Sequence, residues 1–585
     1  MSTDYLSQSF EVLDLTVMNA GISRLLDDVA HNIRGAFVEY TQFLGSKHEK
    51  DIDWWTGNIG SRNSQASNLY ANCCKLYLVK HLIKEGVKID RIVVDSQPLK
   101  KAILRMLRVN SYSCSVEYKT DTLNGLVNRI KTQMKRNSLV SVLYFVFTSI
   151  RQNICARASK KYSTYEHDTN EPVILLDNFV IENSFVNQKF TDRYYPHLRE
   201  YLTETECNRI YFAPTYYQID DYQSMFKNMR MSNEHFLVRE DYLKPSDYFY
   251  AFTHVFRTKK FIKNPPDFLG MEIDDLLKDQ NHLDSVSQAS FEALLKYRFV
   301  MRLNKENVRF ALIVNWFENQ VIDHGFNAGF RKWYPDTPLV GFQLLPHPDH
   351  YLSVYPTEQE KRNSVIPKEV AVMGNGFRDV VKTFCPSLEV TVAPALRFKH
   401  LWNVYESTYD PGVFRVLVAL PYFMDEAIGI LKMLDVITSE LPENFIFHIK
   451  THPTNSIEKT KQAFGVTWPG VFQFASETFD VLVAKTDIVI SSSSSVCLET
   501  IAKGTPVIVI ANAFGITYKY IPEAITQDIW RMCYTADDLK EALVHYSKRD
   551  NETVSNYKEL GRSIRDIYFE PINEVTVRRF LKLEN

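Results

Sequence analysis

The chain has 585 residues, 45% of them hydrophobic, 24% charged and 13% aromatic, a composition typical of a globular protein with a large core. Its 68 Lys and Arg against 70 Asp and Glu leave a formal net charge of −2, so global charge gives no support to a nucleic-acid partner. The eight cysteines form no C-x-x-C pair and no zinc-like spacing with histidine, and the opening residues MSTDYLSQSFEVLDL do not resemble a signal peptide. We therefore expect a reduced, cytoplasmic protein.

The first 400 residues carry isolated apolar runs that predict strands at irregular intervals. These runs are 91–96, 172–178, 209–214, 310–316 and 338–342. Short β-branched runs separated by long stretches predict an α/β lobe with helical insertions. The polar, Pro-containing stretch at 355–369 predicts a surface loop, and we expect the chain to divide into an N-terminal lobe, 1–400, and a C-terminal lobe, 401–585.

The most apolar window of the chain is SLVSVLYFVFTSI at 138–150, and its 13 residues are too few to span a bilayer of about 30 Å as a helix. Basic residues flank it on both sides: Arg129, Lys131, Lys135, Arg136, Arg151, Arg157, Lys160 and Lys161. These charges would suit an anionic membrane surface. A buried helix with solvated ends is the alternative, and the length of the window favours it.

Acidic and imidazole side chains gather just after the predicted strand 310–316. Glu318 follows this apolar run directly, so we expect it to be half-buried, where its surroundings can set its pKa and orientation. We predict that Glu318 is a catalytic carboxylate, with Asp323 and His347 as further catalytic candidates. For each of them the alternative is an ordinary solvated surface side chain.

The last third of the chain alternates short β-branched runs with helical patterns. Strands are predicted at 415–420, 445–450, 487–491 and 506–510, and helices at about 424–439, 456–464, 476–485 and 495–503. This alternation predicts a parallel, doubly wound sheet, and hence a Rossmann-like lobe. Two α/β lobes leave a cleft between them, and ligands of such sheets bind beyond the carboxyl ends of the strands.

Five consecutive serines, Ser491 to Ser495, stand between a predicted strand and a predicted helix. Helix N-termini present free N–H groups to anions. We therefore predict that Ser492, Ser493, Ser494 and Ser495 hold a phosphate and that Glu499 binds ribose hydroxyls. Simple helix capping by Ser494 or Ser495 is the alternative, although capping needs only one serine.

A second polar turn, HIKTHPTN at 448–455, follows the strand 445–450 and therefore lies at the same edge of the sheet. Lys450 is predicted to supply positive charge to a phosphate. His452, next to Pro453, is predicted to donate a proton or a hydrogen bond to a leaving phosphate oxygen. A structural hydrogen bond is the alternative for a lone histidine, and the neighbouring serine turn favours the functional role.

Lys450-x-His452-Pro453 and the Ser491–Ser495 turn together resemble the HP and SS motifs of GT-B glycosyltransferases that use CMP-activated acidic sugars, such as bacterial sialyltransferases and Kdo transferases. A longer set of segments resembles bacterial surface-carbohydrate biosynthesis proteins of O-antigen and capsule assembly: Asp53-Trp54-Trp55, Glu318-Asn319-Gln320 and Ala393-Pro394-Ala395-Leu396-Arg397. The two tryptophans offer a stacking surface for a sugar or, more commonly for large aromatics, core packing. One departure is Asp323-His324-Gly325, which keeps one acid of the sialyltransferase acidic motif and lacks its neighbour.

The resemblance implies a GT-B-like fold, with an N-terminal acceptor lobe, a C-terminal nucleotide-sugar lobe, and transfer in the cleft without a metal or cofactor. It implies that His452 and the serines contact the CMP phosphate, that Glu318 acts as base or nucleophile, and that His347 helps to hold the donor carboxylate. The expected function is transfer of a CMP-activated ulosonic acid, Kdo or a sialic-acid-like sugar, to a growing surface glycan such as lipopolysaccharide or capsule. Two alternatives stay open: a GT-B transferase that uses a UDP- or GDP-sugar, and a nucleotide-binding protein of glycan assembly without turnover. The acceptor is expected to be a glycan or a lipid-linked glycan, and peripheral contact with the inner membrane stays open.

Overall fold

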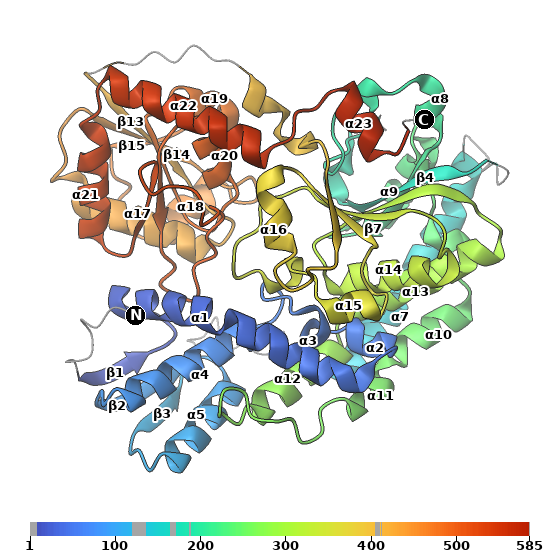
Figure 1. The fold of residues 1–585 in the computed structure, drawn as a ribbon, viewed down its shortest axis with the longest axis horizontal. Helices are drawn as coiled ribbons and strands as arrows, with labels where there is room; N and C mark the ends of the chain where they lie inside the picture. The colour runs from blue at the N-terminus through green and yellow to red at the C-terminus, as the bar shows by residue number, and fades with distance from the viewer. Residues whose placement is uncertain are drawn as a thin grey trace.

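The computed structural model describes residues 9–119, 136–163, 171–186, 189–403, 410 and 412–583. These ranges contain three sheets of three or more strands, all parallel, with helices packed around them. In Figure 1 the C-terminal lobe, orange to red, lies beside the N-terminal lobe, and a small unit in blue lies below the C-terminal lobe.

The N-terminal lobe is built on a seven-stranded sheet in the order β12-β11-β10-β9-β4-β7-β8. The central strands β4 and β9 consist almost entirely of buried residues, as expected for strands covered on both faces. Helices α13 (Gln288–Lys305) and α14 (Val321–Trp333) pack on one of these faces. The strands are β4 (Val173–Val180), β7 (Ile210–Tyr216), β8 (His235–Phe236), β9 (Phe310–Trp316), β10 (Leu339–Gln343), β11 (Glu369–Val372) and β12 (Glu389–Val392).

The C-terminal lobe is built on a six-stranded sheet in the order β15-β14-β13-β16-β17-β18. Its strands are β13 (Phe414–Ala419), β14 (Phe445–Lys450), β15 (Phe472–Phe474), β16 (Ile488–Ser491), β17 (Val507–Ile510) and β18 (Trp530–Cys533). Its helices are α17 (Met424–Thr438), α18 (Ile457–Phe464), α19 (Phe479–Ala484), α20 (Val496–Ala502), α21 (Ala536–Ser547) and α22 (Asn551–Tyr568). Two Rossmann-like sheets, each flanked by helices, confirm the predicted α/β, GT-B-like fold.

The last helix, α23 (Glu574–Phe580), leaves the C-terminal lobe and packs on the N-terminal one. The ring of Phe580 lies 4.6 Å from that of Phe342 on β10. Chain segments therefore connect the lobes both before β13 and after α22, as Figure 1 shows.

A third sheet, which the sequence did not predict, lies near the N-terminus. Its parallel strands β1 (Phe10–Asp14), β2 (Ile89–Val94) and β3 (Ser115–Tyr118) pack with helices α1 (Ala20–Gly45), α4 (Leu69–Lys84) and α5 (Gln97–Val109). The unit also contacts the C-terminal lobe, since Asp27 accepts hydrogen bonds from Thr517 N (2.8 Å) and Tyr534 OH (3.1 Å). The N-terminal lobe therefore carries a small α/β unit in addition to helical insertions.

The apolar window at 138–150 forms most of α7 (Ser138–Ser159), and the expectation of a buried helix is wrong. Leu139, Leu143, Phe147, Ile150 and Ile154 are between 54% and 67% exposed. The helical stretch Ser138–Tyr162 is long and apolar enough to cross a membrane by length and composition alone. The flanking Arg129, Lys131 and Lys135 lie outside the described residues.

The Asp53-Trp54-Trp55 segment belongs to the core. Trp54 and Trp55 are buried, and the Asp53 carboxylate accepts hydrogen bonds from Arg257 Nε at 2.6 Å and Nη2 at 2.7 Å. Buried indoles and a paired carboxylate leave no surface on which a sugar could stack.

Candidate functional site

Glu318 lies immediately beyond β9, at the carboxyl edge of the N-terminal sheet, and is half-buried as the sequence predicted. Its carboxylate accepts hydrogen bonds from Trp316 Nε1 (3.0 Å), Gln320 Nε2 (2.5 Å) and Tyr351 OH (3.2 Å). Three donors, one from the end of β9 and two from loops, hold one orientation of the side chain, which is the condition for a carboxylate that must meet a substrate at a defined point.

Asp323 is buried at the first turn of α14 and supports the loop that carries Glu318. Its Oδ2 accepts from the backbone N–H groups of Glu318 (3.1 Å) and Gln320 (2.9 Å). Burial first, and then the charge of Asp177, raise the pKa of Asp323 to about 8. Its Oδ1 accepts from Asn315 Nδ2 on β9 (3.5 Å). Because the hydrogen bonds are to this strand and loop and the side chain is only 3% exposed, the position suits a structural role better than contact with substrate.

His347 lies beside Tyr351, with their ring centroids 6.1 Å apart. Burial lowers the pKa of His347 to about 3, so the ring is neutral at physiological pH. Within the described part of the chain its Nε2 is buried without a hydrogen-bond partner. His347 can therefore offer a neutral hydrogen bond in this state, and not a positive charge for a donor carboxylate.

Arg397 is a half-buried residue near the boundary between the lobes that the sequence did not assign to the site. Burial lowers the pKa of its guanidinium, while the charges of Glu499, Tyr194 and Glu318 act to raise that pKa. Glu499 belongs to the C-terminal lobe and Glu318 to the N-terminal one, so Arg397 stands between acidic groups of both. Within the described ranges it forms no ion pair with either, which leaves its charge available to an anionic ligand.

The serine turn lies at the carboxyl end of β16, and its members face different partners. Ser491 Oγ donates to Ala419 O (2.8 Å), and Ser492 Oγ to the Glu426 carboxylate (3.3 Å), which also accepts from Asn512 Nδ2 (3.3 Å). Burial raises the pKa of Glu426, and the serine hydrogen bond opposes the rise. The carboxylate beside Ser492 disfavours a phosphate at that hydroxyl.

Ser493, Ser494 and Ser495 complete the turn and are only half-buried. Ser494 Oγ accepts from Val496 N (3.4 Å), and Ser495, the residue before α20, makes no side-chain cap. Glu499 accepts from His400 Nε2 (3.1 Å) and lies 3.5 Å from Ser495 Oγ. Because Ser493 Oγ is buried, the hydroxyls that a ligand can reach are those of Ser494 and Ser495. Ser495, like Ser492, has a carboxylate beside it.

Lys450, His452 and Pro453 lie at the carboxyl end of β14, on the same edge of the sheet as the serines. Lys450 Nζ donates to Glu477 O (2.6 Å). His452 Nδ1 accepts from Thr454 N (3.3 Å) and lies 2.8 Å from Thr454 Oγ1, contacts that suit the neutral tautomer with the proton on Nε2. Burial lowers the pKa of His452, so the ring suits hydrogen-bond donation, while Pro453 is exposed.

Tyr520 marks where the two lobes meet. Burial first, and then the charges of Glu318 and Glu426, raise its pKa to about 12, while a hydrogen bond with Gln65 opposes the rise. A carboxylate from each lobe therefore acts electrostatically on the Tyr520 hydroxyl. The neighbouring Tyr518 OH donates to Ser64 O (2.8 Å) and ties this loop to the N-terminal lobe. The charges of Glu318 and Glu426 both act on Tyr520, and those of Glu318 and Glu499 on Arg397, so these groups lie near the boundary between the lobes. No described contact joins His452 to Glu318.

The sequence missed Arg397, Glu426, Tyr351 and Tyr520 because each takes its place from tertiary packing. Arg397 belongs to the segment 393–397, which resembles surface-carbohydrate biosynthesis proteins, but the residue types of that segment alone do not predict a role for the guanidinium. Glu426 offered a usable signal, since it lies in the first turn of the helix after β13, at the same sheet edge as the serines.

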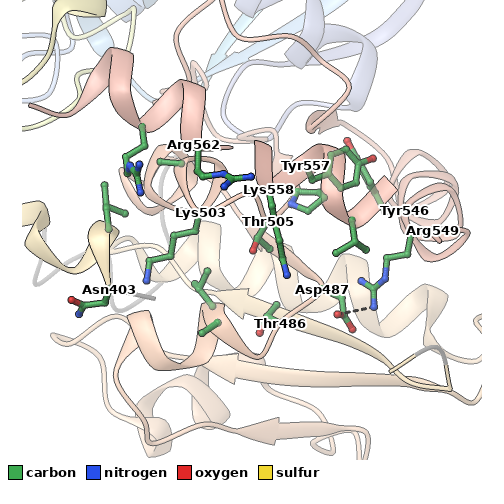
Figure 2. A pocket seen from close by; sticks show the side chains of 18 residues that line it. Asn403, Thr486, Asp487, Lys503, Thr505, Tyr546, Arg549, Tyr557, Lys558 and Arg562 are labelled. Carbon is green, nitrogen blue, oxygen red and sulfur yellow. Dashed lines mark ion pairs between the residues drawn. The ribbon is translucent and has the colours of Figure 1, made fainter. Parts of the chain in front are cut away.

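A separate cavity of about 400 Å³, drawn in Figure 2, lies at the opposite edge of the C-terminal sheet from the serine turn. Its wall includes Thr486, Asp487, Thr505 and Pro506, which precede β16 and β17. These residues lie at the amino ends of strands whose carboxyl ends carry the serine turn. The cavity is therefore not part of the interlobe region, although Lys503, Lys558 and Arg562 give it a basic lining.

Comparison with known proteins identifies no relative by sequence: no protein-family model and no curated protein matches the chain. Solved structures that align with it include the N-terminal domain of Candida albicans trehalose-6-phosphate phosphatase. The two sequences are 9% identical, the alignment covers 72% of this chain and 98% of that one, and the TM-score is 0.41. The UDP-GlcNAc 2-epimerase of Neisseria meningitidis aligns with 12% identity, 70% and 99% coverage, and a TM-score of 0.40. The wall teichoic acid polymerase TagF aligns with 10% identity, 76% and 96% coverage, and a TM-score of 0.35. At these scores the likeness carries no argument about activity, and the fold assignment rests on the sheets themselves.

Proposed function

We propose that this protein is a glycosyltransferase that moves a sugar from a nucleotide-sugar donor bound in the cleft. The observation that carries the proposal is the placement of Glu318, held by three donors, near the unpaired cation Arg397 where the lobes meet. A carboxylate and a cation in a cleft suit a reaction in which a nucleophile is activated while a phosphate leaves.

The donor in this proposal is a CMP-activated ulosonic acid, Kdo or a sialic-acid-like sugar. Such a donor carries both a phosphate and a carboxylate, so two separate anion-binding groups are needed. Arg397 supplies a charge for one of them, and the half-buried Ser494 and Ser495 supply hydroxyls for the other. Glu426 and Glu499 lie beside the serines, where carboxylates can accept hydrogen bonds from ribose hydroxyls.

In the reaction, Glu318 removes a proton from the acceptor hydroxyl or attacks the anomeric carbon itself. His452 Nε2–H donates a hydrogen bond to a phosphate oxygen of the departing nucleotide, a role its hydrogen bond from Thr454 N prepares by favouring that tautomer. Asp323 holds the loop of Glu318 in place and is a positioning residue.

The transfer proceeds without a metal ion or another cofactor, because Arg397 and the serine turn meet the charge of the leaving group. We expect activity to survive EDTA unchanged. Loss of activity on chelation, restored by Mg²⁺ or Mn²⁺, would contradict this part of the proposal.

The acceptor is a growing bacterial surface glycan or lipid-linked glycan, of the kind found in lipopolysaccharide, O-antigen or capsule assembly. The enzyme works in the cytoplasm with peripheral contact to the inner membrane, where lipid-linked acceptors lie. A UDP- or GDP-sugar transferase is the nearest alternative, and a nucleotide-binding protein without turnover is the more distant one.

The test of the proposal is Glu318→Gln. We expect kcat to fall by about 10²–10⁴-fold, while nucleotide affinity stays near that of the wild type, because the amide keeps the shape but cannot take a proton. Glu306→Gln, an exposed carboxylate of the same lobe, serves as the matched control and should leave kcat unchanged. If Glu318 is a nucleophile, mass spectrometry of the wild type with donor alone should find a sugar adduct on it. Wild-type turnover of Glu318→Gln would remove both roles.

A further inference from the structure

Helix α7 turns its polar face inward and its apolar face outward. Its buried positions are Ser141, Phe145, Ser149, Gln152, Ala156 and Ser159, of which only Phe145 is a large apolar residue. Five of its exposed side chains are the apolar Leu139, Leu143, Phe147, Ile150 and Ile154, and Tyr144 and Arg151 are exposed as well. Spacings of three and four residues place these five side chains in one stripe along the helix. Helices of soluble proteins turn such a stripe toward the core, so this one is built to meet a different surface.

The charges that the helix and its two flanks contribute all have one sign, although Asp279 pairs with Arg136 and Asp241 with Lys160. From Arg136 to Lys161 the sequence has five basic residues and no Asp or Glu. Arg157 and Lys161 continue the spacing of the stripe beyond Ile154, and Arg136 precedes Leu139 by three residues. Arg157 and Lys161 are exposed, so the C-terminal end of the apolar stripe carries cations that can meet an anionic surface. At the other end, Arg136 pairs with Asp279.

The inner face of α7 is held on the body of the N-terminal lobe. The ring of Phe145 lies 4.9 Å from that of Phe291 on α13, and Gln288 Nε2 donates to Ser141 O (3.1 Å). Asn153 Nδ2 donates to Tyr248 OH (2.8 Å) on α10 (Pro245–Phe252). Figure 1 shows α7 alongside α13 and α10. A helix attached along one face lies flat on a membrane and does not cross it.

We propose that the stripe Leu139–Ile154 on α7 docks the protein on an anionic lipid bilayer. The five apolar side chains enter the boundary between headgroups and acyl chains to a depth of about 5–10 Å, while the flanking cations contact lipid phosphates. Phe249 on the adjoining α10 is also exposed and enlarges the apolar surface near α7. The inference stands on α7 alone, and it deepens the proposed function by giving the enzyme a way to reach a lipid-linked acceptor.

The test is cosedimentation of the full chain, without nucleotide, with vesicles of phosphatidylcholine alone or mixed with phosphatidylglycerol. We expect binding to the mixed vesicles, weaker binding to phosphatidylcholine alone, and a fall in binding at high salt, which screens the cations. Leu143→Asp with Phe147→Asp should lower partitioning by about tenfold or more. The matched control is Val436→Asp with Val575→Asp, which gives the same charge change at two equally exposed apolar residues of other helices and should bind as the wild type does.

Three results would overturn the proposal: no wild-type binding to anionic vesicles at low salt, equal binding by the α7 variant, or equal losses in both double variants. Light scattering adds a fourth, because a wild-type dimer that becomes monomeric in the α7 variant would assign the stripe to a second copy of the chain. The substituted side chains are exposed, and matching thermal midpoints would show that both variants are folded. Nucleotide binding measured separately distinguishes failure of the docking surface from failure of the proposed activity.

Discussion

Glu360 is a buried carboxylate that ties distant parts of the chain to the loop of Glu318. It pairs with Arg62 Nη2 at 2.8 Å and accepts from Asn319 Nδ2 at 3.0 Å and from Thr357 N at 2.7 Å. Burial alone would raise the pKa of Glu360, but Arg62 and the hydrogen bond from His324 outweigh it and lower that pKa to about 2. Asn319 follows Glu318 directly and has a left-handed backbone conformation, φ 54°, so the network stabilises a turn that the residue alone would rarely adopt.

We predict that Glu360→Gln lowers the free energy of unfolding at neutral pH by about 3–5 kcal/mol, because it leaves Arg62 buried and unpaired. The depressed pKa of Glu360 means that its contribution is present above about pH 4.5 and is lost as the pH falls toward 2. Urea unfolding at several pH values should therefore show the difference between wild type and variant shrinking on acidification. Glu389→Gln, at an exposed carboxylate, is the control, and a difference that stays constant with pH would contradict the account.

At this scale the sequence predicted the position of Glu318 but not its surroundings. An apolar run ending in an acid is enough to place a carboxylate at the end of a strand, as in FALIVNWFE. Arg62 and Glu360 are 298 residues apart, and Glu499 follows Arg397 by about a hundred residues. Such residues come close together only when the chain packs, so no local sequence pattern predicts their interaction.

Helices α13 and α14 pack closely at Gly325. Because α14 follows the Glu318 loop directly, this packing fixes the position of the first turn of α14 relative to that loop. A Cβ on Gly325 would lie 2.0 Å from Ala293 O, a backbone atom that cannot move aside alone. The glycine therefore allows the two helices to approach closely over the sheet, and Asp323 two residues earlier can reach the loop.

We predict that Gly325→Ala costs at least about 1–3 kcal/mol of stability through overpacking and also lowers turnover. Gly35→Ala is the matched control, since Gly35 is also inside a helix and nothing lies within 4 Å of an added Cβ. That change should stabilise the protein by about 0.5–1 kcal/mol through helix propensity. Thermal unfolding of both variants measures the contrast, and equal midpoints would show that the crossing tolerates a methyl group.

The elements that the sequence predicted best are buried parallel strands, because their apolar runs need no tertiary partner to be recognised. The runs at 445–450 and 310–316 coincide with β14 and β9. Short strands such as β3, β8 and β15 were missed, since they have too few residues for a pattern. The orientation of α7 was missed for another reason: hydrophobicity reveals an apolar helix but not which of its faces meets the protein.

The described part of the molecule contains three sheets of three or more strands, and Glu318, Arg397 and Tyr520 lie near the boundary between the two larger ones. The small N-terminal unit reaches the C-terminal lobe through Asp27, whose pKa burial raises to about 6 while hydrogen bonds from Thr517 and Tyr534 hold it down. Helix α23 returns to the N-terminal lobe at Phe342. The C-terminal lobe is thus joined to the rest of the molecule at more than one place, by the small unit and by α23 (Figure 1).

The most direct test of the central claim, that a nucleotide-sugar binds between the lobes, is thermal unfolding of the full chain with CMP, UDP or GDP. A ligand at a hundred times its Kd stabilises the folded state by about 2.7 kcal/mol. We predict that CMP raises the midpoint by a few degrees and more than UDP or GDP does. Ser494→Ala with Ser495→Ala, and separately Arg397→Ala, should reduce that shift. A midpoint that no nucleotide changes, or a CMP shift that both sets of substitutions leave intact, would contradict the account.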